Sequence, residues 1–272
     1  MDIHKPKPWR GVRGRLRGCT GLAVLGLVTV TPLAARAADE EIQVYMDEIG
    51  QVGVLSLDVH TNFVPQGRDT SGYPGEQLSD GRIRITPEWG YAITPALELG
   101  AYLPLTTIDR DGHFEIGGVK GRLKYVAPRP QGQAWFWGLN LEIGNVRKDL
   151  DINPWNGELK GILGMRKGPW TVAGNLNIGF VVSGPHHSDP DIGIATKVSY
   201  SLDETTSIGI ENYNALGSTS EFGPLARNDQ EVFAVVDKGF GRWDLNVGVG
   251  YGYGAYEDRW ILKAIVGVPL GE

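Results

Sequence analysis

The chain has 272 residues, and its 26 basic residues against 32 acidic ones give a formal net charge of −6. This acidic balance argues against nucleic acid as a partner. The only cysteine is Cys19, so the chain cannot form an internal disulfide or a multi-cysteine metal site.

Residues 1–37 have the three parts of a secretory signal peptide. A basic region extends to Arg17, an apolar run covers 22–33, and Ala35-Arg36-Ala37 is a small-x-small cleavage site. The apolar run is too short for a spanning helix, although an anchor that stays attached is the alternative. Cleavage after Ala37 removes seven basic residues and one acidic residue, which leaves a net charge near −12.

The rest of the chain alternates apolar and polar residues. Leu57 and Val59, for example, alternate with Asp58 and His60. Strand side chains point to opposite faces in turn, so this pattern predicts strands with one apolar and one polar face. Twelve strands are expected, near residues 53–64, 81–92, 96–105, 116–127, 133–145, 157–166, 169–182, 191–202, 206–215, 229–239, 242–253 and 258–269.

The connections between these strands alternate in length. Those at 93–95, 128–132, 167–168, 203–205 and 240–241 are short, and the others are mostly longer and polar. Outer-membrane barrels have short periplasmic turns and longer external loops. A soluble sandwich also alternates along its strands, but it places its charges outside and its apolar residues in the core. We therefore predict an all-β fold, a transmembrane antiparallel β-barrel of about twelve strands.

Aromatic residues support the barrel over the sandwich. Eight of them fall on the apolar face beside the short turns, where an interfacial girdle is expected: Trp89, Tyr91, Tyr125, Trp135, Trp137, Trp170, Tyr200 and Trp243. A sandwich core gives no reason for tryptophan to gather at every second turn.

The polar face is expected to line the lumen, and its charged positions are the candidate selectivity residues: Asp58, His60, Arg82, Arg84, Glu98, Lys120, Arg122, Lys124 and Glu142. Five cations on the strands expected at 81–92 and 116–127, with Glu98 on the strand between them, predict a wall that attracts anionic solutes. The same charges also fit a salt-bridged lumen, because charges that leave water need partners. Similar numbers of both signs favour this structural interpretation and a narrow or occluded pore.

The segments EEIQVYMDEIGQVGVLSLDVHTNF, RIRITPEWGYAITPALELGAYLPL and WILKAIVGVPL resemble a group of proteobacterial outer-membrane, transporter-like proteins. That group is related to barrels encoded with phenol meta-cleavage pathways. The resemblance covers nearly all of the chain after the signal peptide and implies a transmembrane barrel with a transport role. It brings no catalytic residues. The chain ends in Leu270-Gly271-Glu272 and lacks the terminal aromatic residue common in such barrels, which weakens the expected recognition by the assembly machinery.

Other chemistry is weakly indicated. His60 is a possible base or ligand, but a hydrogen-bonded lumen histidine is the simpler interpretation. Ser56 shares the strand face of His60 but lies beyond hydrogen-bond reach of it, and no G-x-S-x-G motif occurs. His186 and His187 are a possible metal site in a loop, although no third histidine is near. We expect no enzyme activity, cofactor or metal site.

These inferences combine into one expectation. Residues 1–37 form a signal peptide, 38–52 a periplasmic lead and 53–272 an outer-membrane barrel of a Gram-negative cell. The alternatives for the lead are a plug and an extension of the first strand. The expected function is a passive channel for small organic solutes. The alternatives are a structural barrel with an occluded lumen and, less favoured, a lipid-modifying enzyme. Expected partners are outer-membrane lipid, the assembly machinery and a small solute.

Cleavage after Ala37 is directly testable. We expect protein from fractionated cells to start at Ala38 and to be recovered in the outer membrane, as measured by intact mass and N-terminal peptide analysis. Recovery of a soluble periplasmic product would contradict the barrel prediction.

Overall fold

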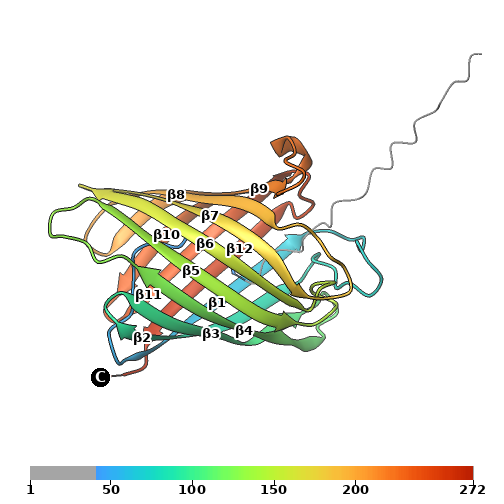
Figure 1. Ribbon diagram of the computed structural model, residues 1–272, viewed down its shortest axis with the longest axis horizontal. Helices are drawn as coiled ribbons and strands as arrows, with labels where there is room; N and C mark the ends of the chain where they lie inside the picture. Colours follow the sequence, from blue (N-terminus) through green and yellow to red (C-terminus); the bar gives the residue numbers. More distant parts are fainter. Residues whose placement is uncertain (1–40, 272) are drawn as a thin grey trace, which may run out of the picture. The chain divides into compact units, whose positions relative to one another are not determined.

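The strands of this chain pair edge to edge until the first meets the last. The computed structural model describes residues 41–271, and Figure 1 shows the closed antiparallel β-barrel that they form. The strands are β1 (Leu55–Gln66), β2 (Ile83–Thr94), β3 (Leu97–Ile108), β4 (Phe114–Val126), β5 (Trp135–Val146), β6 (Trp155–Lys167), β7 (Trp170–Ser183), β8 (Asp191–Ser201), β9 (Thr206–Ser218), β10 (Asp229–Phe240), β11 (Trp243–Gly254) and β12 (Trp260–Pro269). A 3₁₀ turn, η1 (Leu225–Arg227), precedes β10.

Closure between β1 and β12 leaves no free sheet edge. Val59 of β1 pairs with Pro87 of β2 on one side and with Val266 of β12 on the other. In hydrocarbon, each unpaired backbone group costs several kcal/mol, so a spanning sheet must close on itself. The prediction of a twelve-stranded transmembrane barrel is confirmed.

The outer surface is apolar, as a lipid-facing surface must be. Leu139 and Leu163 are 47% and 57% exposed, whereas the adjacent Asn140 and Ile162 are 0% and 3% exposed. A soluble sandwich would bury these leucines and expose the asparagine. The alternation therefore places the polar face inside the barrel.

The ladder is interrupted where β2 carries a proline. Pro87 cannot donate a ladder hydrogen bond. The register between β2 and β3 shifts between Ile85 and Glu88, and β3 carries Pro104 opposite this interruption. The two prolines, which lack backbone N–H donors, therefore lie together at one bulge and interrupt the ladder at a single place.

The strand boundaries agree with the sequence prediction to within a few residues. The predicted signal peptide, 1–37, lies outside the described residues, as do the first residues of the expected periplasmic lead, 38–52. The described part of that lead differs from the expectation, because Val44 and Tyr45 are buried inside the barrel (2% and 3% exposed). No helix within 41–271 is long and apolar enough to cross a membrane.

The two faces of β11 provide a matched test of this register. Val247 points outward near the middle of the strand, and the adjacent Asn246 points inward and donates to Asp237 (Nδ2–Oδ1 2.7 Å). Val247→Lys should lower the free energy of folding into lipid by about 2–4 kcal/mol. Asn246→Lys should cost far less, because Asp237 can pair with the new ammonium. Urea titration of both variants in lipid vesicles measures the difference, and equal penalties would show that the register is wrong.

Candidate functional site: the lumen and its N-terminal segment

Residues 41–50 pass through the barrel interior as irregular chain, here called the N-terminal segment. Ile42 packs in a cluster with Val64 and Tyr256, at the end of the barrel that carries the longer loops. Asp47 contacts Arg129 and Arg166, beside the short turns. The segment therefore extends along most of the lumen before the chain turns into β1.

The segment makes its backbone hydrogen bonds with side chains of the wall. Asn175 of β7 accepts from Tyr45 N (2.7 Å) and donates to Tyr45 O (2.9 Å). Lys263 donates to Ile42 O (2.9 Å), and Lys124 donates to Glu48 O (2.7 Å). Buried backbone groups need partners, and these side chains supply them without a strand ladder.

Apolar residues on the inner face provide the other half of this contact. Ile42 covers Phe233 and Ile261, while Val44 and Tyr45 pack in a cluster with Phe136 and Ile162. Glycines make room for the two phenylalanine rings. A Cβ at Gly164 would lie 2.1 Å from the Phe136 ring, and one at Gly250 would lie 2.3 Å from the Phe233 ring. The lumen therefore presents apolar patches that the segment covers.

The predicted basic wall meets the segment at Tyr45. The Tyr45 ring centroid lies 4.8 Å from Lys160 Nζ, 5.1 Å from Lys124 Nζ and 5.9 Å from Arg122 Cζ. Cations within about 6 Å of an aromatic face are attracted by the ring quadrupole. Two of the five side chains expected to attract solute anions, Arg122 and Lys124, thus lie against an aromatic ring of the chain itself, together with Lys160.

Carboxylates complete the lumen network. Arg122 contacts Glu88 (Nε–Oε1 2.6 Å) and Glu98 (Nη2–Oε1 2.7 Å). Lys160 contacts Glu142 and Glu158 at 2.9 Å and 2.8 Å. These pairs correspond to the salt-bridged interpretation of the lumen charges.

The other predicted lumen residues are placed as follows. His60 is buried and bonds Glu88 (Nε2–Oε2 3.0 Å), and Asp58 lies directly opposite Glu88 in the β1–β2 register. Arg82 lies just before β2 and donates to Gln77 O (3.2 Å), away from Arg122 and Lys124. Arg84 and Lys120 line a cavity at the long-loop end. The structure therefore divides the five expected wall cations between two levels of the barrel.

The predicted girdle residues all lie on the outer surface, and none of the eight is buried. Trp170 and Tyr200 meet edge to face with ring centroids 4.9 Å apart, and Tyr125 meets Trp137 in the same way at 5.8 Å. These pairs stand at the strand ends beside the short turns.

A cavity of about 380 Å³, here called the long-loop cavity, adjoins the N-terminal segment at the end of the barrel that carries the longer loops. Glu41, Gln43 and Tyr213 line it together with residues of the loops 67–82, 147–154 and 184–190. Both charge signs, hydroxyls and aromatic rings face this space. It is large enough for a small organic molecule.

Loop 67–82 is folded over this cavity by specific contacts. Arg68 pairs with Glu76, and Ser79 donates to Asp258 of the β11–β12 loop. The loop brings Tyr73 to the cavity, where its hydroxyl is buried without a hydrogen-bond partner. Burial raises the pKa of Tyr73 above its ordinary value, so its phenol stays a donor at neutral pH.

The hydrogen bonds between Asn175 and Tyr45 provide a test of how the segment is held. Asn175→Ala removes both, at about 1 kcal/mol each, so the Tyr45 amide should exchange with solvent about tenfold faster or more. Asn177→Ala is the matched control, because Asn177 faces inward two residues along the same strand and lines the cavity. Hydrogen–deuterium exchange measured by mass spectrometry should separate them. Unchanged protection of 42–50 in Asn175→Ala would contradict the assignment.

Comparison with known proteins identifies the fold class. No family model matches the chain, and no curated protein sequence matches it. A solved KdgM porin matches with a TM-score of 0.52 at 10% identity, covering 79% of this chain and 99% of that one. A NanC porin matches with a TM-score of 0.50 at 8% identity, covering 80% and 100%. A CymD monoaromatic hydrocarbon channel has a TM-score of 0.45 at 11% identity, covering 80% and 87%. The chain therefore shares its barrel fold with porins of known structure.

Proposed function

We propose that this protein is a passive channel of a Gram-negative outer membrane for small organic solutes, and that the N-terminal segment closes its lumen. The observation that carries the proposal is the segment itself, an irregular chain without ladder pairing in an otherwise continuous barrel. A barrel that served only as a scaffold could be filled by side chains from its strands. A separate segment can leave as a unit and open the lumen.

The long-loop cavity supports solute binding ahead of passage. Arg84 and Lys120 offer positive charge, Glu142 offers negative charge, and the buried Tyr73 hydroxyl offers a free donor. This chemistry suits a small polar organic molecule that carries an ionised group. Resemblance to barrels encoded with phenol meta-cleavage pathways favours an organic solute, and the KdgM and NanC porins share the fold.

The occluded structural barrel is the alternative that a specific observation favours. Tyr45 and Val44 are almost fully buried, and residues at both ends of the segment are anchored to the wall. If these contacts never open, the barrel has no transport role. An enzyme is less favoured because Ser56 donates to Gly90 O while His60 bonds Glu88, which leaves the predicted hydroxyl and imidazole in separate contacts.

Planar-bilayer recording distinguishes the channel from the occluded barrel. We expect the protein starting at Ala38 to give low or intermittent conductance. A variant that lacks residues 38–49 should conduct steadily, because its lumen is cleared while Val52 can keep its bridge to Ala92. Replacement of 41–49 by an equally long Gly-Ser sequence is the matched control for chain length without side-chain contacts.

Folding must be verified for each variant by heat-modifiable migration on gels. A folded deletion variant that never conducts would reject the channel and favour the occluded barrel. Steady conductance of the unmodified protein, equal to that of the deletion variant, would remove the segment from the mechanism.

A further inference from the structure

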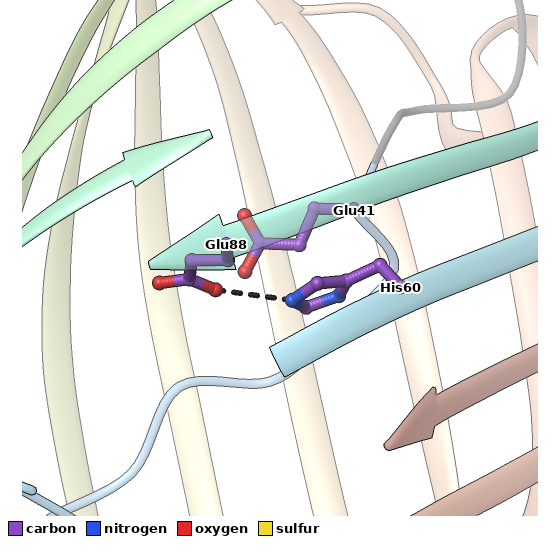
Figure 2. A group of neighbouring side chains, drawn as sticks. All are labelled: Glu41, His60 and Glu88. Atoms are coloured by element: carbon purple, nitrogen blue, oxygen red, sulfur yellow. Dashed lines mark hydrogen bonds and ion pairs between the residues drawn. The ribbon is translucent and has the colours of Figure 1, made fainter. Parts of the chain in front are cut away.

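We propose that Glu41, His60 and Glu88 form a binding site for a divalent transition-metal ion, with Zn²⁺ the best match. Figure 2 shows the three side chains converging inside the barrel, with the Glu41 carboxylate against the His60–Glu88 pair. One ligand atom from each residue lies within 4.8 Å of the other two. The ligands come from three elements, the N-terminal segment, β1 and β2.

Two of these groups carry buried atoms with unused bonding capacity. Glu41 has a side chain only 7% exposed, and its Oε1 has no hydrogen-bond partner within the part of the chain that the structure describes. His60 is 1% exposed, and among the described residues 41–271 its Nε2 bonds Glu88 while its Nδ1 has no partner. A buried carboxylate oxygen without a partner is costly, and a metal ion held with Glu88 and His60 would satisfy it.

Hydrogen bonds and ion pairs from neighbouring side chains orient the carboxylates of Glu41 and Glu88. Arg122 binds Glu88 at Oε1, which leaves Oε2 toward His60. Tyr102 donates to Glu41 at Oε2 (3.0 Å), which leaves Oε1. Metal ligands are usually oriented by such outer hydrogen bonds. Glu41 Oε1 is therefore open to an ion, whereas Glu88 Oε2 would exchange its hydrogen bond with His60 for a bond to the metal.

The charge balance around the site favours a cation. Two cationic side chains, Arg122 and Lys160, contact five carboxylates between them: Glu88, Glu98, Glu41, Glu142 and Glu158. Lys160 lies 3.8 Å from Glu41, farther than from its other two partners. Asp58 adds a further carboxylate directly opposite Glu88. Like charges at close quarters out of water are unfavourable, and a divalent ion would offset them.

The donor set indicates the class of metal. One imidazole nitrogen with carboxylate oxygens suits Zn²⁺, whereas Ca²⁺ and Mg²⁺ prefer sites made of oxygen alone. Zn–N and Zn–O bonds of about 2.0–2.2 Å place ligand atoms about 3.4 Å apart. Small side-chain rotations bring the present donors to that separation. Because Glu41 and Thr86 also line the long-loop cavity, an ion can enter from that side.

The site ties the N-terminal segment to the wall, since Glu41 belongs to the segment and the other ligands to β1 and β2. Metal binding does not depend on whether the lumen conducts. The proposal can therefore fail or hold independently of the channel function.

Zinc binding is measured on the folded protein in detergent at pH 7, by calorimetric titration with Zn²⁺ and by metal analysis after dialysis. We expect close to one Zn²⁺ per barrel. Glu41→Gln and His60→Asn should each weaken binding at least tenfold. Glu41 lies in the N-terminal segment, outside the strand ladder. The Glu41→Gln variant therefore tests the site even if His60→Asn fails to fold.

Two controls separate this site from others. Glu158→Gln removes a carboxylate that contacts the same Lys160 but lies outside the triad, and it should weaken binding far less than Glu41→Gln does. Replacement of His186 and His187 by Asn tests the loop histidines and should also have no effect. The proposal is overturned if the wild type takes up no zinc, if Glu41→Gln binds normally, or if the loop replacement abolishes binding.

Discussion

Pairing of every strand edge is the constraint on which this structure depends. Hydrocarbon offers no partner for a backbone N–H or C=O, so β1 must meet β12 and the sheet must close. Closure divides the side chains into two sets that never mix. Leu139 and Leu163 are exposed on the outer surface, while Asn140 and Lys160 are enclosed. Every later feature of the lumen follows from this enclosure, because polar side chains that face inward must find partners there or remain in water.

The inner face is not uniformly polar, and this explains the N-terminal segment. Phe136, Ile162, Phe233 and Ile261 point into the lumen from strands that also carry buried polar residues on the same face, such as Asn140, Lys160 and Lys263. Exposed to lumen water, these side chains would each lose about 1.5–3 kcal/mol of burial. Ile42 and Val44 cover them, and Lys263, Asn175 and Lys124 bond the accompanying backbone. The contact between the N-terminal segment and the inner face thus resembles packing in a protein core more than the water-filled wall of a wide pore.

The sequence predicted the barrel well and the segment poorly, for physical reasons. Alternation, loop rhythm and tryptophan placement are local signals, and a sheet with lipid on one side makes them obligatory. The placement of 41–50 depends on contacts such as Tyr45 with Asn175, which are 130 residues apart in the chain. A usable signal was present in Phe233 and Ile261, which stand at inward positions of otherwise regular strands. Such apolar inward residues indicate that something covers them. The convergence of Glu41 with His60 and Glu88 could not be predicted, because it depends on the path of irregular chain.

The closed lumen balances two effects of opposite sign. Covering the apolar patches stabilises the bound segment, but it also withdraws the ion pairs of Glu88, Glu142 and Arg122 from water. Desolvation of a buried ion costs several kcal/mol, which close pairing repays only in part. Departure of the segment would expose apolar surface, which is unfavourable, and rehydrate those charges, which is favourable, so the two effects oppose each other. A species that binds one of the two states preferentially shifts the equilibrium toward that state. A solute that competes for the basic side chains around Tyr45 would favour opening, whereas a cation held by Glu41 and the wall would favour closure.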